Sequence, residues 1–128
     1  MAVIINALEN DHIVKLQASE NWTVNEMTAA AHKAAALCSQ SPVPMHILID
    51  VSQAKRLPEE MLHARSLPDL VRLNNSYVVI VGADALVRTM ANALAIMAQS
   101  TRVQHFNTVR DAMAYLRMVN EAERTIIA

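Results

Sequence analysis

Apolar residues recur along the chain in two different periods, and their alternation predicts strands and helices in turn. Residues 2–8 are mostly apolar, and in residues 12–18 two sets of positions alternate, Ile13, Lys15 and Gln17 against Val14, Leu16 and Ala18. The Glu9-Asn10-Asp11 segment between them favours a turn, because Asn and Asp tolerate positive φ and hydrogen-bond to their own backbone. We therefore predict that the chain begins with a β-hairpin.

A helical period follows this hairpin. Thr23 and Glu26 have the spacing of a capping box, which satisfies amide groups at a helix N-terminus. From there to about Cys38, apolar residues recur every three or four positions, so that they form one stripe along a predicted helix. The members of this stripe are Val24, Met27, Ala31, Ala34 and Cys38.

Dense apolar runs mark the strands of the later sequence. The segment Met45–Ser52 is too short for a helix and rich in β-branched residues, which is typical of a central strand buried on both faces. Tyr77–Val81 has the same character and ends at Gly82, the single glycine of the sequence. Arg102–Phe106 is predicted to be a short last strand.

Helix starts follow each of these strands. Pro58-Glu59-Glu60 is typical of a first helical turn, because proline fits there and carboxylates face the positive end of the helix dipole. Asp84 can cap a helix after the second run, and Thr108 with Asp111 caps the last one. The predicted order is β-β-α-β-α-β-α-β-α, an α/β fold with a mixed central sheet and helices packed against it. No linker or repeat divides the sequence, so we expect one domain over residues 1–128.

Composition and charge exclude several classes of partner. Hydrophobic residues make up 53% of the sequence and aromatic ones 3%, and the net charge is -1. Because nothing concentrates Lys and Arg, we expect neither nucleic acid nor anionic lipid as a partner. No apolar run approaches the roughly 20 residues of a membrane span, and the first ten residues do not resemble a signal peptide. A cytoplasmic location is the expectation.

The sequence offers no familiar catalytic or cofactor motif. Phosphate-binding loops need several glycines, and one glycine is present. The single cysteine, Cys38, lies on the apolar stripe and is interpreted as a small core residue. The histidines have no metal-ligand spacing, so we predict no metal, no cofactor and no catalytic residue; they are His12, His32, His46, His63 and His105.

Asp50 is a candidate functional residue, because many doubly wound folds have their functional site at the carboxyl end of a central strand. Phospho-receiver domains use such an aspartate, together with an acidic pair after the first strand and a lysine after the last. Here the sequence starts with a hairpin, and residues 104–107 contain no lysine. We therefore interpret Asp50 as a residue that binds amide groups of the following loop.

Three motifs together resemble the STAS domains, particularly their SpoIIAA-like branch. These are the strand Ile47–Ser52, the strand and turn Tyr77–Asp84, and the segment Val103–Leu116, which leads into the last helix. With the opening hairpin they span nearly the whole chain. The resemblance implies a non-catalytic domain that acts by binding partners.

The same resemblance implies where the working surface lies. In anti-sigma-factor antagonists of this fold, an Asp-Ser pair opens the helix after the central strand, and its serine is phosphorylated. The matching positions here are Pro58 and Glu59, so no phosphorylation is expected at that place. The resemblance then implies a partner-binding surface around Ser52, Arg56, Pro58 and Glu59.

The first hypothesis is a STAS-like regulatory or protein-interaction domain, whose partner is another protein or a second copy of the chain. Two other functions stay open. The alternative is a small-molecule or lipid-binding module with an apolar cleft, lined by Met and Ala, between helices and sheet. An enzyme is the third hypothesis, and it requires that the scattered histidines or Asp50 meet Ser52 in one pocket.

Overall fold

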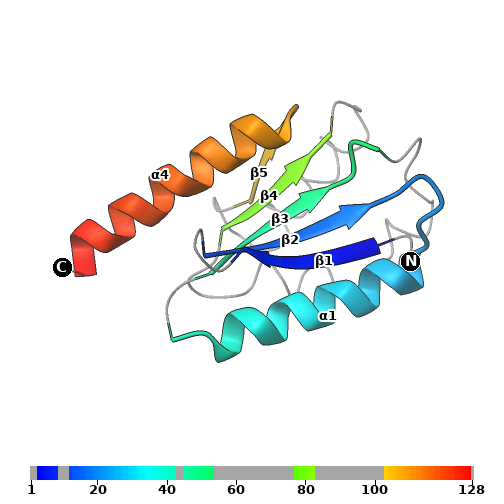
Figure 1. Cartoon of the computed structure of the whole chain (residues 1–128), viewed down its shortest axis with the longest axis horizontal. Coiled ribbons are helices and arrows are strands. Elements are labelled where there is room, and N and C mark those ends of the chain that lie inside the picture. Colours follow the sequence, from blue (N-terminus) through cyan, green and yellow to red (C-terminus); the bar gives the residue numbers. More distant parts are fainter. Residues whose placement is uncertain (1–2, 9–11, 43–44, 54–76, 83–102, 128) are drawn as a thin grey trace.

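The computed structural model describes residues 3–8, 12–42, 45–53, 77–82 and 103–127. Five strands and two helices lie within these residues (Figure 1). They are β1 (Val3–Leu8), β2 (Ile13–Ala18), α1 (Val24–Gln40), β3 (His46–Asp50), β4 (Val78–Val81), β5 (Val103–Phe106) and α4 (Val109–Ile127). The helices predicted after Pro58 and Asp84 lie outside the described residues.

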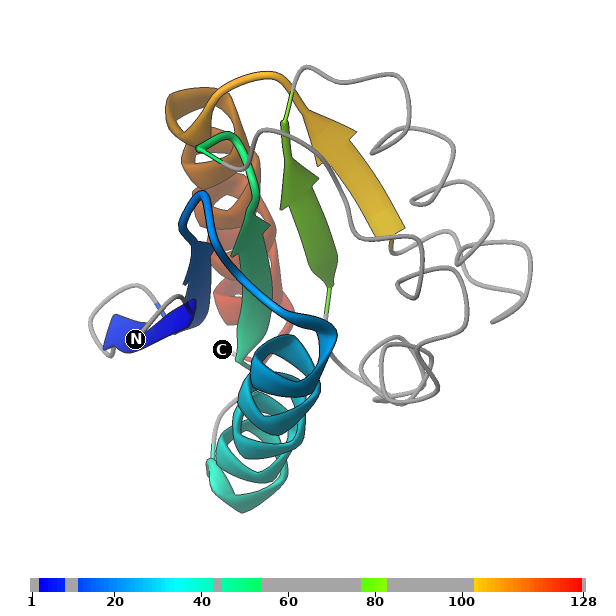
Figure 2. The same cartoon turned by 90° about the vertical axis from the view of Figure 1, so that its right-hand side faces the viewer.

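The strands form one mixed sheet in the order β1-β2-β3-β4-β5. β1 and β2 are antiparallel, with Val3 opposite Ala18 and Leu8 opposite Ile13, so the predicted hairpin is confirmed. The pairs β2–β3, β3–β4 and β4–β5 are parallel. Figure 2 shows β1 at one edge and β5 at the other. The predicted mixed α/β sheet is confirmed.

The two described helices lie on opposite faces of the sheet (Figure 1). This arrangement explains why every residue of β3 and β4 is buried, as the dense apolar runs of the sequence predict. β1, at the edge, has one buried residue, Val3, and its other residues are exposed or half-buried. The central strands are therefore fixed by packing on both sides.

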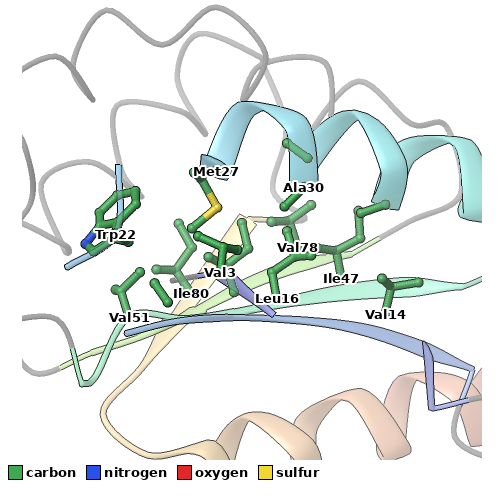
Figure 3. Packing of buried hydrophobic residues seen from close by; sticks show 14 of the residues in the cluster. Val3, Val14, Leu16, Trp22, Met27, Ala30, Ile47, Val51, Val78 and Ile80 are labelled. Atoms are coloured by element: carbon green, nitrogen blue, oxygen red, sulfur yellow. The ribbon is translucent and has the colours of Figure 1, made fainter. Parts of the chain in front are cut away.

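On the α1 side, small side chains let the helix lie close to the sheet (Figure 3). Met27, Ala31 and Ala34 from the predicted stripe are each at most 1% exposed, whereas Cys38 is half-buried against the same cluster. The Thr23 hydroxyl caps the helix by accepting the Glu26 N–H at 3.2 Å, and it donates to the Glu26 carboxylate at 3.1 Å. The predicted N-terminus of this helix is confirmed.

On the α4 side, a second and smaller cluster joins the last helix to the strands. Ala112 and Leu116 of α4 are completely buried against strand residues that include Leu48 and Val79. Thr108 accepts the Asp111 N–H at 3.1 Å, as its position in the sequence predicts. The helix continues to Ile127.

Candidate functional site

The candidate site lies at the carboxyl edge of the parallel strands, where β3, β4 and β5 end side by side. Two backbone hydrogen bonds, donated by the residues that follow β3 and β4, join these strand ends. The Val51 N–H donates to the Val81 carbonyl, and the Gly82 N–H donates to the Phe106 carbonyl, both at 3.0 Å. The first residue after β3 and the first residue after β4 are therefore each bonded to the neighbouring strand.

Asp50 and Ser52 form a braced turn at this edge. The Asp50 side chain is 3% exposed, and its Oδ1 accepts both the Ser52 N–H at 2.9 Å and the Ser52 hydroxyl at 2.5 Å. Ser52 itself is exposed. A buried carboxylate is costly unless hydrogen bonds compensate for its lost water. Asp50 thus binds an amide group of the loop, the role that we expected of it.

Of the four residues in the predicted partner-binding surface, the structure describes Ser52. The other three, Arg56, Pro58 and Glu59, lie outside the described residues. Their part in the surface therefore stays a prediction. The structure brings Asp50 and Ser52 together, which the sequence places two positions apart at the end of one strand.

The described histidines occupy separate elements. His12 lies in the hairpin turn, His32 is exposed on α1, His46 begins β3 and His105 lies in β5. Among the described residues, no three His, Cys, Asp or Glu side chains are placed to hold a metal ion. His63 lies outside those residues.

His46 has a structural role that the sequence reasoning missed. Its side chain is fully buried, and its Nδ1 accepts the Tyr77 backbone N–H at 2.9 Å. The two rings also meet edge to face, with centroids 5.3 Å apart. His46 therefore joins the starts of β3 and β4 on the α4 side of the sheet. Its position inside an apolar strand was the available signal that it would be buried.

Tyr77 also belongs to a group of aromatic rings that includes residues of β5 and α4. Tyr115 of α4 lies 6.1 Å from the Tyr77 ring and 5.3 Å from the Phe106 ring, measured between centroids. Burial raises the pKa of the Tyr115 hydroxyl above its ordinary value of 10.0, and the neighbouring Tyr77 raises this pKa further. This aromatic cluster, His46, Tyr77, Phe106 and Tyr115, fastens α4 to the sheet.

A hollow of about 360 Å³ lies at the opposite end of the sheet, between the hairpin turn and the end of α1. Its lining is mixed, with apolar side chains from β1, α1 and the connection between α1 and β3, and the polar side chains of His12, Gln40 and Ser41. His12 has a φ of 56°, so the backbone adopts the left-handed region beside this hollow. The apolar members of the lining are Ala7, Leu37, Pro42 and Met45.

No family model matches the sequence, and no curated protein does. The structure is similar to that of an anti-sigma-factor antagonist (STAS) domain protein from Planctomyces limnophilus, with a TM-score of 0.60 and 10% sequence identity. The match covers 89% of this chain and 97% of the other. Within the described residues, neither helix is long and apolar enough to cross a membrane. The chain has the fold of a STAS domain.

Proposed function

We propose that this protein is a non-catalytic regulatory or protein-interaction domain, and that it binds a protein partner with the surface that begins at Ser52. The observation that carries the proposal is the likeness, over 89% of the chain, to a protein described as an anti-sigma-factor antagonist (STAS) domain protein. We expect the protein to act in the cytoplasm as one domain of residues 1–128.

The braced turn supports the location of this surface. Asp50 holds the Ser52 amide and hydroxyl from inside the sheet, while Ser52 is exposed to solvent. A contact surface on a fixed turn loses less conformational entropy on binding than one on a free loop. The surface then continues along the sequence through Arg56, Pro58 and Glu59, the positions that follow from the STAS resemblance.

The experiment is a comparative pull-down with two charge reversals. The Arg56→Glu variant changes the proposed surface, and the Arg110→Glu variant makes the same change at an exposed position of α4. Proteins captured from a lysate of the source organism are quantified by mass spectrometry. We expect Arg56→Glu to lose at least one protein that both the wild type and Arg110→Glu retain. Equal capture by all three proteins would refute the surface.

The hollow beside the hairpin favours a second candidate function, an apolar small-ligand module. Its volume of about 360 Å³ is at the lower end of the range for small-molecule sites. An Ala7→Phe variant fills the hollow, and an Ala36→Phe variant adds the same ring at an exposed position of α1. If the hollow binds apolar ligands, Ala7→Phe alone lowers the binding of an anilinonaphthalene sulfonate dye. Unchanged dye binding would remove this candidate.

A further inference from the structure

The residues after α1 provide few backbone donors for the carbonyl groups at its end. In any α-helix, the last four carbonyls have no partner within the helix. Here the Ser41 N–H donates to the Cys38 carbonyl at 3.4 Å. Pro42 and Pro44, two of the four residues that follow the helix, have no N–H to donate. The negative end of the helix dipole therefore lies at a place where the chain is poor in donors.

No nearby residue of the sequence supplies a lysine or arginine to this helix end. The last turn of α1 contains no basic residue. The two stretches of sequence that border the hollow beside the hairpin, residues 7–14 and 37–45, contain neither Lys nor Arg. Basic side chains are favourable at the C-terminus of a helix, because they bond its last carbonyls and interact with its dipole. The end of α1 is therefore a favourable place for a cation that these stretches do not supply.

The hollow beside the hairpin lies against this helix end. Four of its described lining residues belong to the last turn of α1 or follow it directly; they are Leu37, Gln40, Ser41 and Pro42. Figure 1 shows the end of α1 and the start of β2 at the same end of the sheet. The His46 N–H donates to the His12 carbonyl at 2.9 Å, which joins the hairpin turn to the start of β3. About 150 Å³ is enough for benzene, so about 360 Å³ accepts one ring with a short chain.

We propose that the hollow binds a small apolar primary amine, with the apolar body between Ala7 and Leu37 and the ammonium group at the end of α1. An ammonium group has three donors and no acceptor, so it matches a site rich in carbonyls. The side chains of Gln40, Ser41 and a neutral His12 can each accept a hydrogen bond as well. A carboxylate would instead meet the negative end of the dipole. This inference rests on the second candidate function, the small-ligand module, and names its class of ligand.

Three probes with the same ring and different end groups test the charge of the ligand. They are 2-phenylethylammonium, 2-phenylethanol and 3-phenylpropanoate. Their dissociation constants for the full chain are measured at pH 8, where ordinary imidazoles are neutral, from the NMR shifts of the amides in the last turn of α1. We expect the ammonium probe to bind most tightly and the carboxylate probe about tenfold more weakly. Equal affinities, or no binding of the ammonium probe, would overturn the proposal.

The Gln40→Lys variant supplies the missing cation from the chain itself. Its ammonium group competes for the end of α1, so we expect the affinity for the ammonium probe to fall about tenfold or more. The carboxylate probe should then bind more tightly than the ammonium probe. A lysine in the last helical turn favours the helix, so unfolding would not explain this reversal. Ala29→Lys, the matched control at an exposed position of α1, keeps the wild-type order. The proposal is wrong if Gln40→Lys keeps that order too.

The Ala7→Phe variant separates this inference from the candidate function on which it rests. It fills the hollow, so it must weaken the binding of all three probes, the uncharged alcohol included. If it does so while the wild type binds the three probes equally, the hollow is a ligand site but the amine class is wrong. If Ala7→Phe leaves the binding of all three probes unchanged, the candidate function and the amine site both fail.

Discussion

Replacement of Asp50 by alanine tests whether the turn after β3 is held by its buried carboxylate. The change removes the acceptor of both the Ser52 N–H and the Ser52 hydroxyl. A hydrogen bond to a charged group contributes about 1.5–3 kcal/mol. Because Ser52 is exposed and water can replace its lost partner, we expect a total loss of about 2 kcal/mol in the free energy of unfolding. For 128 residues this lowers Tm by roughly 7 °C.

Three further variants divide this loss between its parts. Ser52→Ala removes the hydroxyl bond and keeps the amide bond, so we expect a loss of about 0.5–1.5 kcal/mol. In the double variant the hydroxyl bond cannot be lost twice, and the two effects fall short of additivity by about 0.5 kcal/mol or more. Asp50→Asn keeps an acceptor oxygen without the charge, and its stability lies between the wild type and Asp50→Ala.

Urea unfolding followed by circular dichroism measures all four variants, with the thermal midpoint as a second readout. An Asp50→Ala protein as stable as the wild type would refute the reasoning, because it would mean that the desolvation cost of the buried carboxylate equals its hydrogen bonding. Strict additivity of Asp50→Ala and Ser52→Ala would also refute it, since the two residues would then act independently.

Three predictions concern the α4 side of the sheet. Leu116→Ala removes a fully buried side chain between α4 and the strands, and we expect urea unfolding to show a loss of about 2–5 kcal/mol; a loss below 1 kcal/mol would contradict this packing. His46→Leu leaves the Tyr77 N–H without its acceptor, and the expected loss is about 1–3 kcal/mol, whereas an unchanged Tm would contradict it. The pKa of Tyr115 is raised in the folded state, so its contribution to stability is complete below pH 10 and is lost as pH rises through the folded pKa. In a pH titration followed by tyrosinate absorbance, one of the two tyrosines must ionise at a higher pH than the other. The Tyr115→Phe variant must lack this step at higher pH.

The main elements of the described structure could be predicted because their signals are local. The apolar part of a run such as Met45–Ser52, observed as the strand His46–Asp50, is buried on both faces in any sheet that places it centrally. Thr23 and Thr108 cap helices through amide groups three residues away, so the sequence alone contains the whole interaction. The hairpin likewise depends on the turn residues between its two strands.

The interactions of the α4 side could not be predicted in the same way. The aromatic cluster depends on the parallel register of β3 and β4, which places His46 beside Tyr77, and on the way α4 crosses the sheet. His46 and Tyr77 are 31 positions apart in the sequence, and Tyr77 and Tyr115 are 38 apart. No local sequence pattern relates residues at such separations. For the candidate site, the position of Asp50 at the end of the strand was predictable, whereas the double hydrogen bond from Ser52 needed the geometry of the turn.

Site-specific photocrosslinking is the most direct test of the central claim, that a protein partner binds the surface which begins at Ser52. A photoreactive amino acid replaces Ser52 in one variant and exposed Arg110 of α4 in the other. Both variants are expressed and irradiated in the source organism, and the adducts are identified by mass spectrometry. The account predicts that the Ser52 variant captures a partner protein which the Arg110 variant does not. The same adducts from both positions, or none from Ser52, would contradict it.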